Sequence, residues 1–301
     1  MSGQAPDRSK ALRQVVDPEV LARVGGLGLR ARLLAEGALQ GQHRSPHRGA
    51  SVEFAQHREY TPGDELKHLD WKAYARQDRY VVKQFEDETN LRVFLLVDTS
   101  NSMNYGAPSK LDFGATVAAA LAYVLLRQGD AVGLQVFGDT LGEYVPPRGR
   151  PDHFWNLVRV LESVPVGGET KIVPALEHLS EAAGRRAAIY LVSDLLDFDP
   201  RTVALLRELR RRRHKVQVLH VLHPDEVRFP FEDLTLFEAL ETAEEELADP
   251  RGMRDQYLEE MRAFCEDLRR RLGEGDVGYR RVETTEPIDT LLLELLSGRA
   301  G

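Results

Sequence analysis

The chain has 301 residues, of which 42% are hydrophobic and 29% are charged, a balance that predicts a folded protein with a sizeable core. Its 48 acidic residues outnumber its 40 lysines and arginines, and the net charge of -8 argues against nucleic acid as the main partner. No apolar run reaches the roughly 18 residues of a membrane span, and Met1 to Asp17 lack the apolar core of a signal peptide, so we expect a cytoplasmic protein.

The first part of the chain, residues 1–79, is predicted to be an accessory segment packed on a larger body. Residues 18–38 are amphipathic but are interrupted by glycines, so we expect one or two helices followed by a polar loop over 41–49. Residues 51–80 mix aromatic and charged side chains around the turn signal Pro62-Gly63-Asp64, which is typical of an irregular, hydrogen-bonded segment.

Residues 80–301 alternate regularly between strand and helix patterns and are predicted to form the main domain. Strands over 80–85 and 93–97, joined by a turn near 87–90, are predicted to pair antiparallel. A helix over 111–127 follows, and then a strand over 131–137 that continues in a hairpin to 143–145. Next come helices over 151–161 and 173–183, a strand over 188–192, a helix over 201–212 and a strand over 216–222.

The tail of the main domain is predicted to complete the same sheet. It contains a hairpin over 234–247, a long helix over 253–272, a strand over 277–282 and a last helix over 288–296. Uninterrupted apolar strands such as Ile189-Tyr190-Leu191-Val192 need helices on both faces of their sheet, because neither face can be polar. The sequence therefore predicts a three-layer α/β sandwich with a mainly parallel central sheet.

Oxygen-bearing side chains follow two of these strands at the point where each strand ends. The strand over 93–97 runs into Asp98-Thr99-Ser100-Asn101-Ser102, the strand over 188–192 is followed by Asp194, and Thr170 lies in a loop between two helices. Alternate side chains of an extended segment share a side, so Asp98, Ser100 and Ser102 can point at one place. Asp and Ser are also ordinary helix N-caps, and the first segment alone does not decide between capping and metal binding.

The complete set resembles the metal-ion-dependent adhesion site of von Willebrand A domains, in which Asp-x-Ser-x-Ser is completed by a later Thr and a later Asp. This resemblance implies a von Willebrand A-like (Rossmann-like) fold and a bound Mg²⁺, with Mn²⁺ or Ca²⁺ possible. One departure is Leu195, which stands where a small residue such as Gly is frequent. The metal ligands implied by the resemblance are Asp98, Ser100, Ser102, Thr170 and Asp194.

The preceding block narrows the resemblance to domain-of-unknown-function family fifty-eight (DUF58). The likeness covers residues 41–200, extends more faintly to the end, and includes Gly41-Gln42-His43-Arg44-Ser45, Leu69-Asp70-Trp71 and Phe85-Glu86. Such proteins look like partners of MoxR-type AAA+ ATPases, which are thought to mature or activate other proteins. Many carry membrane-spanning helices before this block. The candidate partner-binding residues are Glu59, Tyr60, Asp64, Asp70 and Trp71.

The resemblance implies a non-enzymatic adaptor whose metal grips an acidic residue of a client protein or of the ATPase. The sequence contains no Gly-x-x-x-x-Gly-Lys-Ser/Thr loop and no Gly-x-Ser-x-Gly elbow, so ATP hydrolysis is expected to belong to a partner. Two alternatives stay open. Asp98 could serve a magnesium-dependent phosphohydrolase, although Ser100 stands where haloacid-dehalogenase-like phosphatases have a second acid. The chain could also be a metal-free scaffold.

Overall fold

The structure is a computed structural model that describes residues 26–42, 56–59, 81–84, 91–165, 167–184, 186–196, 198–238 and 245–297. Its contacts divide the chain into two compact units. One consists of Leu39–Asn90, and the other contains Met1–Ala38 and Leu91–Gly301. The predicted boundary between residues 79 and 80 falls inside the smaller unit.

The smaller unit contains a two-stranded antiparallel sheet. Strand β1 (Gln56–Glu59) pairs with β2 (Val81–Gln84), with Gln56 opposite Gln84. The predicted pairing of residues 80–85 with residues 93–97 is therefore wrong. The physical reason is that the later strand, β3 (Arg92–Asp98), already has a parallel neighbour on each side and has no edge left for β2.

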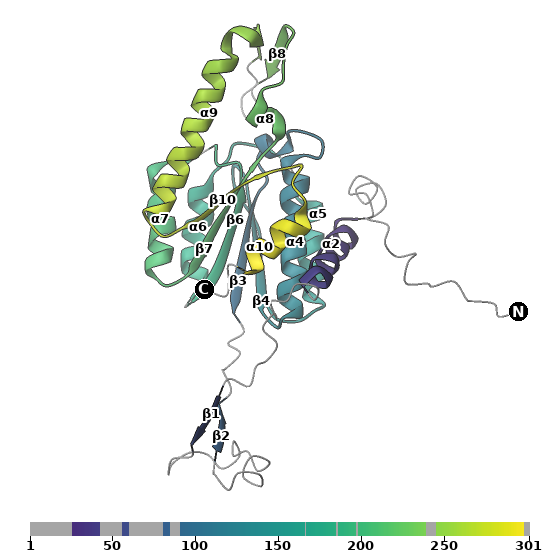
Figure 1. Cartoon of the computed structure of the whole chain (residues 1–301), viewed down its shortest axis with the longest axis vertical. Helices are drawn as coiled ribbons and strands as arrows, with labels where there is room; N and C mark the ends of the chain where they lie inside the picture. Colours follow the sequence, from purple (N-terminus) through teal and green to yellow (C-terminus); the bar gives the residue numbers. More distant parts are fainter. Residues whose placement is uncertain are drawn as a thin grey trace, which may run out of the picture. The chain divides into compact units, whose positions relative to one another are not determined.

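The larger unit is built on a six-stranded sheet in the order β10-β7-β6-β3-β4-β5 (Figure 1). All neighbouring pairs are parallel except β4 and β5, which form the predicted hairpin. The predicted strand near the end of the chain does complete this sheet, as β10 at its edge. The remaining strands are β4 (Ala131–Phe137), β5 (Leu141–Arg148), β6 (Ala187–Ser193), β7 (Lys215–Leu222) and β10 (Gly278–Glu283).

Helices cover both faces of this sheet, which confirms the three-layer α/β sandwich with a mainly parallel sheet. One face carries α4 (Lys110–Arg127), α5 (His153–Ser163) and α10 (Ile288–Ser297). The other carries α6 (Ile172–Ala182), α7 (Pro200–Arg211) and α9 (Pro250–Gly273). Helix α2 (Leu27–Gln42) is tied to α5, since the Leu27 amide donates to Glu162 Oε1 at 2.8 Å.

An extension separates β7 from β10 in the chain. It comprises α8 (Pro224–Arg228), the antiparallel hairpin β8 (Thr235–Glu238) and β9 (Glu245–Ala248), and α9. Figure 1 shows α8, β8 and the amino-terminal half of α9 projecting beyond one end of the sheet. Within the described part of the chain, no helix is both long and apolar enough to span a membrane.

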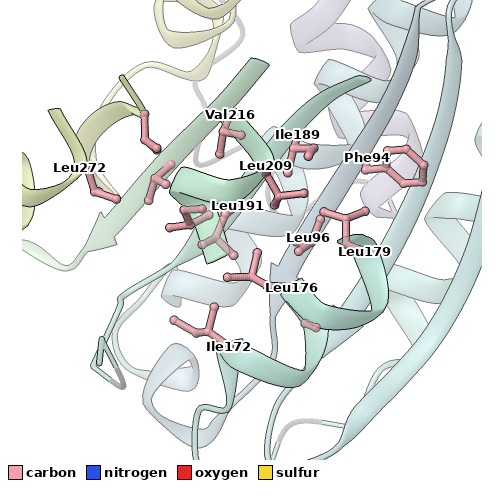
Figure 2. Packing of buried hydrophobic residues seen from close by; sticks show 14 of the residues in the cluster. Phe94, Leu96, Ile172, Leu176, Leu179, Ile189, Leu191, Leu209, Val216 and Leu272 are labelled. Carbon is pink, nitrogen blue, oxygen red and sulfur yellow. The ribbon is translucent and has the colours of Figure 1, made fainter. Parts of the chain in front are cut away.

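The core beneath α6, α7 and α9 shows how the strand pattern generates the layers. Alternate residues of β3 and β6, such as Phe94, Leu96, Ile189 and Leu191, join helix residues in one buried cluster (Figure 2). The intervening residues of the same strands are also buried and face the other helix layer. Continuous apolar strands were therefore a sound basis for predicting helices on both faces.

Helix α4 approaches the opposite face so closely that it needs small residues. A Cβ placed on Gly114 would lie 2.8 Å from Val192 Cγ1, which is closer than carbon atoms pack without displacement. Ala115, Ala118, Ala119, Ala120 and Ala122 continue this small, buried surface along the helix. The alanine-rich sequence of α4 thus sets its distance from β6.

We predict that Gly114→Ala destabilises the protein although alanine is the better helix former. Overpacking a stiff, buried valine costs about 1–3 kcal/mol, more than the ~1 kcal/mol that alanine contributes by helix propensity. Gly37→Ala in α2 is the matched control, because nothing lies within 4 Å of its added Cβ, and it should be stabilising. Urea denaturation measures both, and equal stabilisation by the two substitutions would contradict the packing argument.

Candidate metal centre

The candidate site lies at the carboxyl edge of the sheet, where backbone hydrogen bonds hold three loops together. The Asn101 amide donates to the Gly168 carbonyl at 3.0 Å, and the Gly167 amide donates to the Thr99 carbonyl at 3.2 Å. The Lys171 amide donates to the Gly138 carbonyl at 3.0 Å. The loop after β3 is therefore fixed to the loop that carries Thr170, as the predicted convergence at one sheet edge requires.

Three hydroxyl groups from these loops form one buried cluster. Ser100 Oγ and Ser102 Oγ are 3.1 Å apart, and Thr170 Oγ1 donates to Ser100 Oγ at 2.9 Å. The Ser100 amide donates to Asp98 Oδ1 at 3.0 Å, which turns the carboxylate toward the same loop. The structure thus brings together four of the five predicted metal ligands, each at most 2% exposed.

The environment of Asp98 disfavours its negative charge. Burial, followed by the nearby charge of Asp194, raises the pKa of Asp98 to about 7. Hydrogen bonds lower the pKa of Asp98 but do not cancel these two effects. One of them is donated by Ser193 Oγ to Asp98 Oδ2 at 2.6 Å. Among the described residues, no cation forms an ion pair with Asp98 to offset its burial.

The fifth predicted ligand, Asp194, is held by a lysine that the sequence reasoning missed. Lys110 Nζ donates to Asp194 Oδ2 at 2.7 Å and to Glu226 Oε1 at 2.6 Å. Burial opposes the charge of Lys110, but the two carboxylates outweigh it and the pKa of Lys110 is raised. One signal was available: Lys110 begins a helix, where the helix dipole disfavours a cation that has no acidic partner.

Leu195, the departure from the adhesion-site pattern, lies in a backbone conformation that favours glycine. Leu195 has a φ of 58°, a left-handed conformation that glycine adopts without steric cost. Its side chain is fully buried in the core, and its amide donates to Ser193 Oγ at 3.0 Å. Leu195 therefore adopts a left-handed turn that glycine would also allow, and anchors it with an apolar side chain.

The donor set fits a hard divalent cation. Two carboxylates and three hydroxyls are oxygen ligands of the kind that Mg²⁺ and Ca²⁺ prefer, and the described part of the chain supplies no ion pair to the buried Asp98. The described residues contain no group of three or more His, Cys, Asp or Glu placed to hold a metal. The candidate site is built largely from Ser and Thr hydroxyls, so it does not need a third His, Cys, Asp or Glu side chain.

The predicted partner-binding residues lie largely outside the described part of the chain. Glu59 is the last residue of β1, and only its backbone is described. Tyr60, Asp64, Asp70 and Trp71 fall outside the described residues, so their assignment stays a prediction.

Comparisons with known proteins identify one matching family. The family model described as "Protein of unknown function DUF58" matches residues 56–266, which include all the candidate metal ligands. An uncharacterized protein of Mycobacterium tuberculosis is 27% identical over 262 residues, covering 84% of this chain and 81% of that protein.

Two solved structures show more remote similarity. BatB from Bacteroides thetaiotaomicron is 18% identical and has a TM-score of 0.45. The match covers 70% of this chain and 98% of the BatB chain. An aerotolerance-related membrane protein from Bacteroides fragilis is 19% identical and has a TM-score of 0.47. That match covers 69% of this chain and 97% of the other chain.

The raised pKa of Asp98 predicts that the metal-free protein loses stability as pH rises. Between its ordinary pKa of 3.8 and about 7, the folded protein binds more protons at Asp98 than the unfolded chain does. The free energy of unfolding should fall by at most roughly 1.4 kcal/mol per pH unit in this window. Urea denaturation in chelator between pH 5 and pH 7.5 measures this slope. Asp98→Asn should flatten it, and identical slopes would contradict the assignment.

Proposed function

The chain belongs to the DUF58 family, and we propose that it is a non-enzymatic, metal-dependent protein-binding adaptor of the cytoplasm that works with a MoxR-type AAA+ ATPase. The observation that carries this proposal is the convergence of Asp98, Ser100, Ser102, Thr170 and Asp194 at the carboxyl edge of the sheet. Four of these side chains lie in one hydrogen-bonded cluster, and Asp194 is close enough to raise the pKa of Asp98.

The chemistry of these donors favours recognition of an acidic group. Asp98 supplies the main negative charge, whereas Ser100, Ser102 and Thr170 supply neutral oxygens. An ion held mostly by neutral donors keeps unspent positive charge, so a partner's Asp or Glu can become a further ligand. Because the donors are buried, a partner carboxylate reaches such an ion only after the surrounding loops part.

The proposed ATPase partner rests on the family resemblance and on the chain's own sequence. The sequence has no phosphate-binding loop for ATP, so energy from hydrolysis must come from another protein. In this proposal the metal site grips an acidic residue of the ATPase or of its client. The region from Glu59 to Trp71 is the candidate for a second contact with the ATPase.

The two alternative functions have less support. A phosphohydrolase of the haloacid-dehalogenase type needs a general acid near its nucleophile. The residue at that place is Ser100, whose hydroxyl forms hydrogen bonds with Ser102 and Thr170. Turnover of a generic phosphate ester with Mg²⁺, lost in both Asp98→Asn and Asp194→Asn, would revive that function. A metal-free scaffold would bind its partners equally well in chelator.

We predict that the purified protein binds one Mg²⁺ or Mn²⁺ ion through Asp98. Asp98→Ala should abolish binding, because it removes the charged ligand and leaves only neutral oxygens on the loop. Isothermal titration calorimetry measures the isotherms, and circular dichroism checks that the variant is folded.

The matched control for this experiment is Asp255→Ala, which removes an exposed carboxylate on α9. It should bind the ion like the wild type. Equal isotherms for wild type and Asp98→Ala would remove Asp98 from the site.

A second prediction concerns the partner. If a carboxylate of the ATPase is the metal's ligand, chelation and Ser100→Ala should both weaken the complex with the MoxR-type ATPase of the same organism. Losing a charge-assisted contact corresponds to about a ten- to hundred-fold loss of affinity. If the client is the ligand, the ATPase complex should survive chelation while client capture fails.

Pull-down and titration with and without chelator distinguish these two cases. Recovery of no AAA+ ATPase under either condition, together with assemblies that are indifferent to Asp98→Ala, would leave the metal-free scaffold as the better description.

A further inference from the structure

Lys110 is the buried cation that connects the candidate metal site to another part of the fold. Its side chain is fully buried and lies between Asp194, also fully buried, and Glu226, whose side chain is 16% exposed. Asp194 follows β6 at the carboxyl edge of the sheet, whereas Glu226 belongs to α8. One ammonium group therefore bridges a predicted metal ligand and the first helix of the extension.

The buried charge of Lys110 has two energetic costs that its partners must offset. Burying an ammonium group requires close anionic partners, and the amino terminus of a helix repels a cation. A neutral side chain on α4 would satisfy packing without either cost. The carboxylates of Asp194 and Glu226 offset both costs, so the lysine depends on them as they depend on it.

Other contacts join the loop before α4 to the same part of α8. Tyr105 Oη donates to Asp225 Oδ2 at 3.3 Å, and its ring meets the His223 ring edge-on at 5.3 Å between centroids. A Cβ on Gly106 would collide with the His223 ring, so this glycine permits the close approach. The loop that begins at the candidate ligands thus ends against α8.

Side-chain contacts also connect the segment after α8 to α9. Phe229 follows α8 and stacks on Tyr257 of α9, with ring centroids 4.5 Å apart. Arg254 of α9 donates to the Phe231 carbonyl at 2.7 Å. A change in how α8 is held therefore reaches the base of the extension through packed groups.

We propose that Lys110 is an internal counter-ion that competes with a bound divalent cation for Asp194, so that ion binding breaks the bridge from Asp194 to α8. The proposal rests on the metal-dependent function proposed above. It assigns Lys110 and Glu226 as positioning residues that set the affinity of the site and link it to the extension.

The electrostatic argument follows from the number of charges around Asp194. A divalent ion at Asp98, Ser100 and Ser102 repels the nearby ammonium and attracts Asp194. When Asp194 turns to the ion, Lys110 keeps a partner because Glu226 remains within hydrogen-bond distance. Glu226 therefore lets the lysine release Asp194 without leaving an unpaired buried charge.

The double variant Lys110→Met/Glu226→Gln separates this competition from a simple change in charge. Together the two substitutions leave the summed charge of Asp98, Asp194, Glu226 and Lys110 unchanged, while they remove the competitor for Asp194. Methionine also keeps an unbranched apolar stem in the buried position. This variant should bind Mg²⁺ or Mn²⁺ about tenfold more tightly than the wild type, as measured by calorimetry.

Two single variants complete the set. Glu226→Gln keeps the lysine but removes its second partner, so Lys110 should hold Asp194 more firmly and weaken ion binding by about tenfold. Lys215→Met is the control, since it removes an exposed lysine at the first residue of β7 and should bind like the wild type. Glu226→Gln keeps the proposal falsifiable even if the double variant folds poorly, because undiminished ion binding by this variant would contradict it.

The calorimetric outcomes distinguish this proposal from the proposed function. If the wild type binds the ion and the double variant binds it no more tightly, the counter-ion proposal is wrong and the metal function stands. If only the double variant binds, the lysine does exclude the ion, but the wild-type protein is not metal-dependent. If neither binds, both proposals fall.

Hydrogen exchange supplies a second readout, on α8 itself. The Phe229 amide donates to the Asp225 carbonyl at 2.8 Å and reports on the end of this helix. Adding Mg²⁺ should slow exchange in peptides covering residues 224–229 of the wild type, because Lys110 then pairs with Glu226 alone and holds α8 more firmly. It should leave the double variant unchanged, because that variant has no lysine to release. The same change in both proteins would overturn the proposed link to α8.

Discussion

Strand β3 is the constraint on which the arrangement of the larger unit depends. It pairs in parallel with β4 and β6, and every residue from Val93 to Ser100 is buried. Such a strand can carry polar chemistry only where the chain leaves the sheet. Its register with β6, in which Val97 lies opposite Val192, brings Asp98 next to Ser193 and then to Asp194. The site is thus a consequence of strand pairing, and side-chain contacts refine it.

The concentration of carboxylates at that edge creates an electrostatic problem that the fold solves only in part. Lys110 pairs with both Asp194 and Glu226 across a buried bridge, whereas Asp98 receives hydrogen bonds and no ion pair from the described residues. Burial, followed by the nearby charge of Asp194, raises the pKa of Asp98, and hydrogen bonds from neutral donors do not offset these effects as a cation would. A divalent ion would supply the missing charge, so the ion and the lysine need to be considered together.

The sequence predicted the elements of the main domain and the convergence of the donor residues well, because both follow from local patterns. Apolar strands, alanine-rich helices and polar residues at strand ends can each be recognised within a short window. The pairing of β2 with β1 could not be recognised in this way. Strands adjacent in sequence favour a local hairpin, and only the occupied edges of β3 exclude a hairpin of β2 with β3. Lys110 was missed for a similar reason: its partners lie 84 and 116 residues away along the chain.

Leu195 gives the site a property that a glycine at the same position would not. Its buried side chain belongs to the cluster beneath α6 and α7, so the left-handed turn after Asp194 is immobilised by the hydrophobic core. A glycine would allow the same turn but would leave many others accessible in its place. The peptide that follows Asp194 is therefore preorganised before any ligand arrives. A substitution that loosens the core under α6 would therefore disturb the positions of the candidate ligands at the sheet edge, although no donor residue is changed.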